Sequence, residues 1–382
     1  MKRIADRTWT IMLVLFTAAG SVFSSDVGAV EFVIVGPRAM GMGGTGVAVT
    51  TDALATYWNP AGLAMQRSVD IRVQVSGQIT DRLGIADTLD EIDNIDTSDT
   101  SAANQAKLQN LLNRLNGATV SAAGAAGLYF KGSFGNHAFG FNLSDVATGG
   151  QFTPTPLTAS VSGSTLTVNG ELALRGLEAR QVGFSYAYAL ANQTLSFGAT
   201  VKIIQGAAYA GSSRVVGSEG ALGFTSDLGK PTISTAMGID AGAIVRPFSW
   251  LRIGLVGKDL NQPTFDAPGG QEFKLLPQVR GGVGVNPYSS LTLTFDGDVT
   301  SNKTLLPGVK SRMLGIGAEQ TVFGGALSLR VGALKNVEDA QSKVVPTAGL
   351  GIAIGAFRLD LGGGYDFNES QALASGSLAL TF

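Results

Sequence analysis

The segment VDIRVQVSGQIT, residues 69–80, alternates apolar and polar side chains along its length. Its odd-numbered positions carry valine or isoleucine, apart from Gly77, and its even-numbered positions carry aspartate, arginine, glutamine, serine or threonine. Successive residues of a β-strand point to opposite faces of a sheet, so this segment predicts a strand with one apolar and one polar face. The same clear alternation occurs over residues 291–298, 327–331 and 357–367.

Further segments show a weaker alternation and extend the pattern over most of the chain. They are residues 120–131, 137–147, 172–190, 193–208, 233–246, 250–259, 277–286, 310–320, 345–355 and 372–382. Together the segments make about fourteen strands, an even number, as in single-chain bacterial outer-membrane barrels. A strand rises by about 3.3 Å per residue, so a tilted ten-residue strand covers the ~25 Å apolar band of such a barrel. The sequence therefore predicts an all-β, antiparallel transmembrane barrel of about fourteen strands.

The composition agrees with a chain that presents apolar surface to lipid. Charged residues make up 15% of the 382 residues, against about 25% in ordinary soluble domains, and the mean hydropathy is +0.22. Beyond the first 30 or so residues, no uninterrupted apolar window reaches the roughly 18–20 residues that a helical span needs. The absence of cysteine excludes disulfides and thiolate chemistry, and a net charge of −2 gives no electrostatic footprint for nucleic acid.

The first 29 residues are typical of a secretory signal peptide. Lys2, Arg3 and Arg7 form a basic start, residues 9–19 form a short apolar stretch, and Val27-Gly28-Ala29 offers small residues for cleavage after Ala29. The alternative is a short membrane anchor, although no stop-transfer pattern follows. We expect an exported protein in the outer membrane of a Gram-negative bacterium.

The connections between the predicted strands alternate in length. Short ones are expected near Gly132–Asn136, Ala191–Asn192, Pro247–Ser249, Pro287–Tyr288, Phe323–Gly324 and Gly355–Ala356, and longer ones at 80–119, 148–171, 209–232, 260–276, 301–309, 336–344 and 368–371. Outer-membrane barrels have short periplasmic turns and longer extracellular loops. The order therefore predicts that both termini of the barrel lie on the periplasmic side. A periplasmic β-sandwich or solenoid is the alternative, but it does not explain the regular asymmetry.

The first long connection contains a predicted helix. Leu108, Leu111, Leu112 and Leu115 recur with helical spacing between Ser101 and Gly117, so we expect a small helical extracellular loop that packs on the lip of the barrel. Docking of a partner protein on the leucine stripe is the alternative. An acidic run from Asp87 to Asp99 precedes it. Calcium binding is an alternative for this run, but the spacing differs from an EF-hand loop and no glycine turn is present. A solvated charged face is favoured, and no metal site is predicted.

The sequence contains no convincing catalytic or cofactor motif. Gly41, Gly43 and Gly46 match a dinucleotide fingerprint by spacing alone, because no strand–helix context surrounds them. The single histidine, His137, shares the parity of apolar residues in a strand and is interpreted as an interfacial residue. We therefore expect neither enzymatic activity nor a cofactor.

Several cations lie on the polar parity of the predicted strands and face the barrel lumen. An arginine in a restricted lumen can hold a carboxylate bidentately, so these residues are candidates for ligand binding. The alternative, which we favour, is that they form ion pairs with lumen acids such as Glu319, Asp296 and Asp360 or with the N-terminal segment. The candidates are Arg72, Lys202, Arg252, Arg280, Arg330 and Arg358.

Two runs near the N-terminus resemble the start of FadL-like outer-membrane proteins: RAMGMGGTGVAV (residues 38–49) and, after an acid at Asp52, YWNPAGL (residues 57–63). That superfamily includes long-chain fatty acid and aromatic hydrocarbon transporters, PorV-type secretion proteins and TraF-like conjugal transfer proteins. The helical insertion at 87–116 and the run GKDLNQP (residues 257–263) are most similar to the TraF-like branch.

The resemblance implies a division of the mature chain and two functions. Residues 30–66 would be a hatch segment that plugs the lumen of a barrel made by residues 67–382, with the hatch motif Gly41, Gly43, Gly44, Asn59, Pro60 and Ala61. The first function is a gated passive channel for hydrophobic small molecules. The alternative is an accessory or structural barrel for conjugation or protein secretion. The expected partners are outer-membrane lipid and either a hydrophobic small molecule or a conjugation or secretion protein, without nucleic acid.

Overall fold

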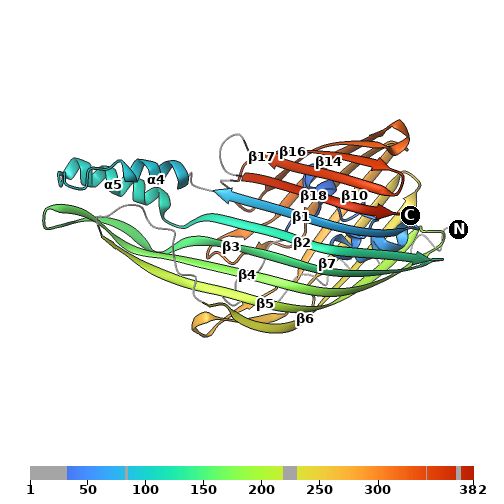
Figure 1. Cartoon of the computed structure of the whole chain (residues 1–382), viewed down its shortest axis with the longest axis horizontal. Helices are drawn as coiled ribbons and strands as arrows, with labels where there is room; N and C mark the ends of the chain where they lie inside the picture. The colour runs from blue at the N-terminus through green and yellow to red at the C-terminus, as the bar shows by residue number, and fades with distance from the viewer. Residues whose placement is uncertain (1–31, 82–84, 218–229, 341, 367–370) are drawn as a thin grey trace, which may run out of the picture.

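The computed structural model describes residues 32–81, 85–217, 230–340, 342–366 and 371–382 (Figure 1). The signal peptide predicted at residues 1–29 lies outside the described residues. Among the described helices, none is long and apolar enough to cross a membrane.

Fourteen antiparallel strands form one closed barrel, as predicted. In chain order they are β1 (Val69–Asp81), β2 (Ala118–Phe134), β3 (His137–Ser162), β4 (Thr165–Leu190), β5 (Leu195–Gly217), β6 (Thr232–Phe248), β7 (Leu251–Lys258), β10 (Gln278–Tyr288), β11 (Leu291–Asp298), β14 (Met313–Val322), β15 (Leu327–Asn336), β16 (Val345–Ile354), β17 (Phe357–Tyr365) and β18 (Gln371–Thr381). Neighbours in the sequence are neighbours in the barrel, and β1 pairs with β18 to close it. At this seam Val69 and Phe382 exchange backbone hydrogen bonds of 3.0 and 2.9 Å.

The two faces of the barrel wall follow the alternation of the sequence. On β1, the side chains of Val73 and Val75 are 57% and 60% exposed on the outer face. Arg72, Gln74 and Ser76, between and beside them, are buried in the lumen. A barrel with an apolar exterior and a polar interior satisfies its backbone hydrogen bonds strand to strand and places its apolar side chains toward lipid.

One end of the barrel carries only tight turns, and we call it the turn end. The turns lie at 135–136, 191–194, 249–250, 289–290, 323–326 and 355–356, close to the predicted positions. The sequence pattern places two of these turns about two residues too early, at Pro247 and at Pro287. Both prolines lie inside strand ends, where the pairing register is irregular between Val245 and Phe248 and between Val285 and Tyr288. Proline lacks the N–H that a regular ladder needs, so it occupies such an irregularity.

The opposite end, which we call the loop end, differs from the prediction at 148–171. That stretch is not a long loop, because β3 runs on to Ser162 and β4 begins at Thr165 after a tight turn at Gly163. Pro154 and Pro156 suggest a loop, but they lie where the β3–β4 register shifts on either side of Thr155. Likewise β5 continues to Gly217 into the predicted 209–232 loop, of which residues 218–229 lie outside the described residues.

Two helices pack on this extended hairpin, as Figure 1 shows on the left. They are α4 (Ile85–Asp93) and α5 (Ala102–Leu115), and the Oγ of Ser101 accepts a hydrogen bond from the backbone N–H of Asn104 at the start of α5. The leucine stripe Leu108, Leu111, Leu112 and Leu115 is the buried face of α5. It packs in one apolar cluster with Leu157 of β3 and Leu166 of β4.

Two further loop-end segments fold over the mouth of the barrel. The hairpin of β8 (Thr264–Ala267), η2 (Pro268–Gly270) and β9 (Gln271–Lys274) buries Phe265 against the inner-face residues Leu177 and Ile204. The connection that contains β12 (Asn302–Lys303) and β13 (Lys310–Ser311) buries Leu306 beside Phe152 of β3. The lumen is therefore covered from the loop end.

Candidate functional site

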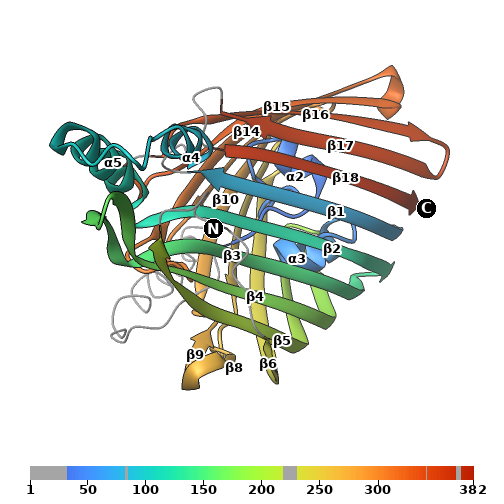
Figure 2. The same cartoon turned by 60° about the vertical axis from the view of Figure 1, so that its left-hand side comes forward.

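The hatch, described from residue 32 to residue 66, lies inside the barrel (Figure 2). It contains α2 (Pro37–Gly41), α3 (Ala55–Trp58) and η1 (Pro60–Met65). Helix α2 contacts β15 to β18, whereas η1 contacts β2 to β6 on the other side of the lumen. Nearly every residue between 32 and 65 is buried. The hatch therefore bridges opposite walls and fills the space between them.

Glycines allow the backbone of the hatch to touch the backbone of the wall. Gly43 has a φ of +69°, and a Cβ there would collide with the carbonyl oxygens of Ile316 and Ala333. Gly41 packs in the same way on Gly349 of β16. Gly44 also has a positive φ, +73°. Wall glycines are equally confined by hatch backbone, namely Gly315, Gly317, Gly332 and Gly362. Only glycine permits both the left-handed conformation and the close approach.

The Asn59-Pro60-Ala61 turn is fixed by hydrogen bonds. The side chain of Asn59 caps η1 by accepting from the N–H of Ala61 at 3.1 Å, and it donates to the carbonyl of Val47 at 3.1 Å. Pro60 occupies the first position of η1, where a missing N–H costs nothing. Ser196 of β5 donates to the carbonyl of Ala61 at 2.7 Å. The motif thus ties two parts of the hatch to each other and to the wall.

Wall carboxylates accept hydrogen bonds from buried backbone N–H groups of the hatch that lie outside its helices. Asp296 of β11 accepts hydrogen bonds from Gly46 at 2.6 Å and Val47 at 2.8 Å. Asp70 of β1 accepts from Ala53 at 3.0 Å. Charged acceptors make such bonds stronger than neutral ones. These contacts fix the two non-helical segments of the hatch that contain Gly46 and Ala53.

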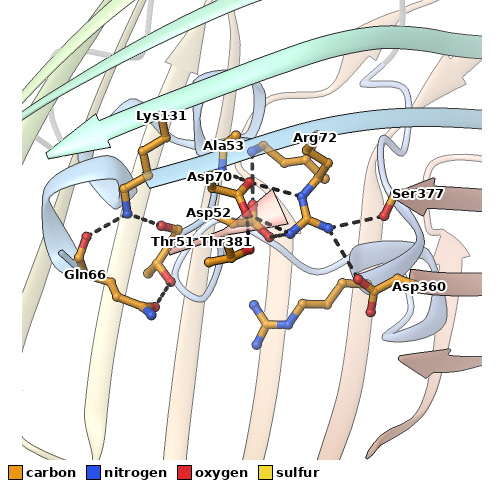
Figure 3. A network of polar contacts seen from close by, with 12 residues as sticks. Thr51, Asp52, Ala53, Gln66, Asp70, Arg72, Lys131, Asp360, Ser377 and Thr381 are labelled. Carbon is orange, nitrogen blue, oxygen red and sulfur yellow. Dashed lines mark hydrogen bonds and ion pairs between the residues drawn. The ribbon is translucent and has the colours of Figure 1, made fainter. Parts of the chain in front are cut away.

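A continuous chain of ion pairs joins two parts of the hatch, at Arg38 and at Asp52, to four strands. Asp52 of the hatch lies 3.3 Å from Arg72 of β1, which also contacts Asp70 and Asp360 at 3.3 Å (Figure 3). Arg330 of β15 continues the chain, 2.7 Å from Asp360 of β17 and 2.7 Å from Glu319 of β14. Glu319 in turn pairs with Arg38 of the hatch at 2.7 Å. We call this the ion-pair chain.

The ion-pair chain determines the protonation of the hatch carboxylate. Burial alone would raise the pKa of Asp52, but the positive charges of Arg72 and Arg38 outweigh burial, and the pKa lies below its ordinary value. Beside it, Lys131 of β2 donates to the backbone carbonyls of Thr51 and Gln66, each at 2.6 Å (Figure 3). Asp52 is therefore ionised at neutral pH.

On the loop-end side of the ion-pair chain, aromatic hatch residues meet two cations. The ring of Phe32 lies 4.4 Å from Lys258 Nζ and 4.0 Å from the Arg280 guanidinium carbon, and it packs on Trp58 with the ring centres 5.3 Å apart. Lys258 Nζ is 3.3 Å from the ring centre of Tyr57. The face of an aromatic ring attracts cations, most strongly where water is excluded.

Two small cavities flank Phe32, each of about 40 Å³. Lys258 lines one, and Arg280 with Asp296 lines the other. Within the described part of the chain, Arg280 Nη2 and Asp296 Oδ1 are buried without a hydrogen-bond partner. Each cavity has room for a few water molecules but not for an aromatic compound. Phe32 therefore lines both spaces.

The structure places the predicted lumen cations in two groups. Arg72 and Arg330 belong to the ion-pair chain, and Arg280 pairs with Asp298 at 2.6 Å. Lys202 pairs with Asp240 and Asp259. Arg252 and Arg358, in contrast, lie near the turn end, where Arg252 is half-buried and Arg358 is exposed.

Sequence reasoning missed Phe32 and Lys258. Lys258 shares the inward parity of Arg252 on β7, which was a usable signal. Phe32 follows the predicted cleavage position and carries no local pattern. In the ranges that the structure describes, no three His, Asp or Glu side chains converge as a metal site would require.

This geometry defines a class by its fold: a closed fourteen-strand barrel whose lumen is filled by an N-terminal hatch, the fold that the chain shares with FadL-type barrels of known structure. Within that class, the family model described as "F plasmid transfer operon, TraF, protein" matches residues 56–298, well over half of the chain. The chain belongs to that family.

Solved structures of low sequence identity share the fold. The toluene transporter TbuX of Ralstonia pickettii is 17% identical, with 91% of this chain and 97% of that chain covered at a TM-score of 0.52. The CymD monoaromatic hydrocarbon channel is 14% identical, with 92% and 98% covered at 0.55. A Pseudomonas aeruginosa FadL homologue is 12% identical, with 93% and 99% covered at 0.52. No curated protein sequence matches the chain.

Proposed function

We propose that this protein is a gated passive channel for small hydrophobic molecules in the outer membrane of a Gram-negative bacterium. In this proposal the turn end faces the periplasm, and the helices α4 and α5 lie outside the cell. The apolar outer wall supports insertion in a membrane. The similarity to hydrocarbon channels of the same fold supports the substrate class.

The observation that carries the channel proposal is the position of Phe32. Its side chain lines two cavities on the loop-end side of the ion-pair chain, and its ring is held by cation–π contacts and aromatic packing. An apolar aromatic ligand can replace these contacts one for one. Rotation of Phe32 would join the cavities into a single apolar and aromatic site beside the hatch, and this site would be the first step of passage.

The test is uptake by purified protein in proteoliposomes, with toluene as the probe. Phe32→Ala should raise the rate of protein-dependent uptake several-fold, because the joined cavities no longer need a side-chain movement. Phe134→Ala is the matched control, since Phe134 is 82% exposed on the outside of the turn end. No protein-dependent uptake by either the parent or Phe32→Ala would overturn the channel proposal.

A second candidate is an accessory barrel for plasmid transfer, and a specific observation favours it. The described lumen is packed with ion pairs, and the cavities beside Phe32 are too small for a ligand. The family description also refers to a plasmid transfer operon. Under this alternative, deletion of the gene should lower conjugation frequency, the Phe32→Ala variant should restore it fully, and toluene uptake should not depend on the protein.

A further inference from the structure

Two arginines near the turn end face into the lumen without a carboxylate partner in the described ranges. Arg246 lies on the inward parity of β6, and Arg252 lies on that of β7. Both are half-buried. Arg246 donates to the backbone carbonyl of Asn192 at 3.1 Å, and Arg252 makes one long contact, 3.4 Å, to Oδ1 of Asn286.

Two positive charges act on Arg252 in the described part of the chain. They are Arg38 and Arg246, and Arg38 already pairs with Glu319. Partly buried like charges repel each other more strongly than they would in water. A desolvated guanidinium that lacks a counter-ion retains unused hydrogen-bond donors, and an incoming anion would both use them and relieve the repulsion.

The positive charge extends around the rim of the turn end. The six tight turns contain no aspartate or glutamate. Arg67 precedes β1 and Arg358 lies near the start of β17, and both are exposed. These two strands are far from β6 and β7 in the barrel order, so the cations lie on opposite sides of the mouth. Four carboxylates near this end, Asp52, Asp70, Glu319 and Asp360, are engaged in the ion-pair chain.

The loop end carries charges of both signs. Asp90, Glu91, Asp93, Asp96 and Asp99 are exposed there beside cations such as Lys107, Arg114 and Lys343, and Glu91 pairs with Arg114. The tight turns of the turn end, in contrast, contribute no carboxylate that would compete for its arginines. A local excess of positive charge steers an acidic partner toward that end.

We propose that the arginines of the turn end bind an acidic segment of a periplasmic protein, with Arg246 and Arg252 as its recessed contacts. The inference rests on the orientation given in the proposed function, but not on transport. A flexible segment fits because Arg246 and Arg252 point into the mouth, where a flat protein surface does not reach. A protein segment, rather than a small organic acid, fits because the cations span the mouth from β6 and β7 to β1 and β17.

The probe is a fluorescent octaglutamate peptide, added to the full mature chain in nanodiscs, with binding read by fluorescence anisotropy. The double variant Arg246→Gln/Arg252→Gln should bind the peptide about tenfold more weakly, because two charge-assisted bidentate contacts are lost. The double variant Arg114→Gln/Arg180→Gln is the matched control, since both arginines are more than half exposed and lie away from the mouth of the turn end, Arg114 on α5 and Arg180 on the outer face of β4. It should bind like the parent.

Three further measurements make the result decisive. Heat-modifiable mobility on gels verifies that every variant folds. Arg252→Lys keeps the charge but loses the planar fork, so it should bind with intermediate affinity. Benzoate should compete poorly. Equal binding by the parent and the Arg246→Gln/Arg252→Gln variant would overturn the proposal, and so would benzoate competition as strong as that of unlabelled peptide, which would indicate a small-acid site. Toluene uptake is read separately, so failure of either proposal leaves the other testable.

Discussion

Arg38 of the hatch and Glu319 of β14 are 281 positions apart in the sequence, yet their charged groups lie 2.7 Å apart. Arg330 shares the same carboxylate. Glu319 thus balances one cation of the hatch and one of the wall. It is the residue through which the ion-pair chain passes from the barrel wall to helix α2 of the hatch. Its removal leaves two cations close together in a confined space.

The first prediction concerns this carboxylate. Glu319→Gln should destabilise the folded protein by about 3 kcal/mol, because breaking a buried pair leaves an uncompensated charge. Urea unfolding in liposomes, followed by tryptophan fluorescence, measures the loss. Glu91→Gln is the control, since Glu91 pairs with Arg114 on an exposed surface and should change stability little. Equal effects of the two variants would contradict the central place of Glu319.

The second prediction concerns the close approach of hatch and wall. Gly43→Ala should displace the hatch, since a Cβ at a φ of +69° costs about 1–2 kcal/mol and also collides with two carbonyl oxygens. Conductance in planar bilayers should rise. Gly135→Ala controls for the backbone conformation alone, because Gly135 has a φ of +59° and an added Cβ would meet nothing within 4 Å. If both variants conduct alike, the contact with the wall has no part in closing the lumen.

The third prediction concerns the outer wall. Val73→Arg should cost roughly 2–4 kcal/mol, as expected for a charge in the middle of the apolar band. Phe134→Arg, at the turn end, should cost about 0–1 kcal/mol because its side chain reaches the interface. Both residues are exposed on the outside, so only depth distinguishes them. Unfolding free energies measured in the same liposomes test the difference, and identical costs would argue against a membrane at this depth.

The fourth prediction concerns pH. The pKa of Asp52 is lowered in the folded state, so its contribution to hatch stability is fully present above the ordinary pKa of an aspartate, about 3.9. The contribution is lost as the pH falls from there through the lower folded value. Limited proteolysis of the hatch should therefore be unchanged from pH 7 to about pH 4 and should increase below it. Asp52→Asn should remove this acid-induced step, and a persistent step would assign it to another carboxylate.

The sequence predicts the barrel well because the information for each strand is local. Val69 to Thr80 reveal a face by alternation alone, and this holds wherever lipid lies on one side and the lumen on the other. The prediction of a loop at residues 148–171 was wrong because this hairpin extends past the apolar band. There Thr155 and its neighbours need no apolar face toward lipid, so the alternation that marks a strand is missing. In this hairpin, Leu157 and Leu166 are buried apolar residues that α5 covers.

The site is less predictable because its contacts are distant in the sequence. The alternation along the strands indicates that Arg72 and Arg330 face the lumen. It does not show that Asp52 of the hatch pairs with Arg72, or that Glu319 links Arg330 to Arg38. Phe32 is the clearest case. It acquires its importance only from Lys258 and Arg280, more than 200 residues later in the chain.

The seam between β1 and β18 has a consequence for biogenesis. The hatch precedes β1, and the wall around it is complete only when β18 pairs with β1 across Val69 and Phe382. The earliest-synthesised part of the folded molecule is therefore enclosed by the latest. A sheet that still lacks β18 has two open edges and leaves the hatch unsheltered, so we expect docking of the hatch and closure of the barrel to be interdependent steps of assembly.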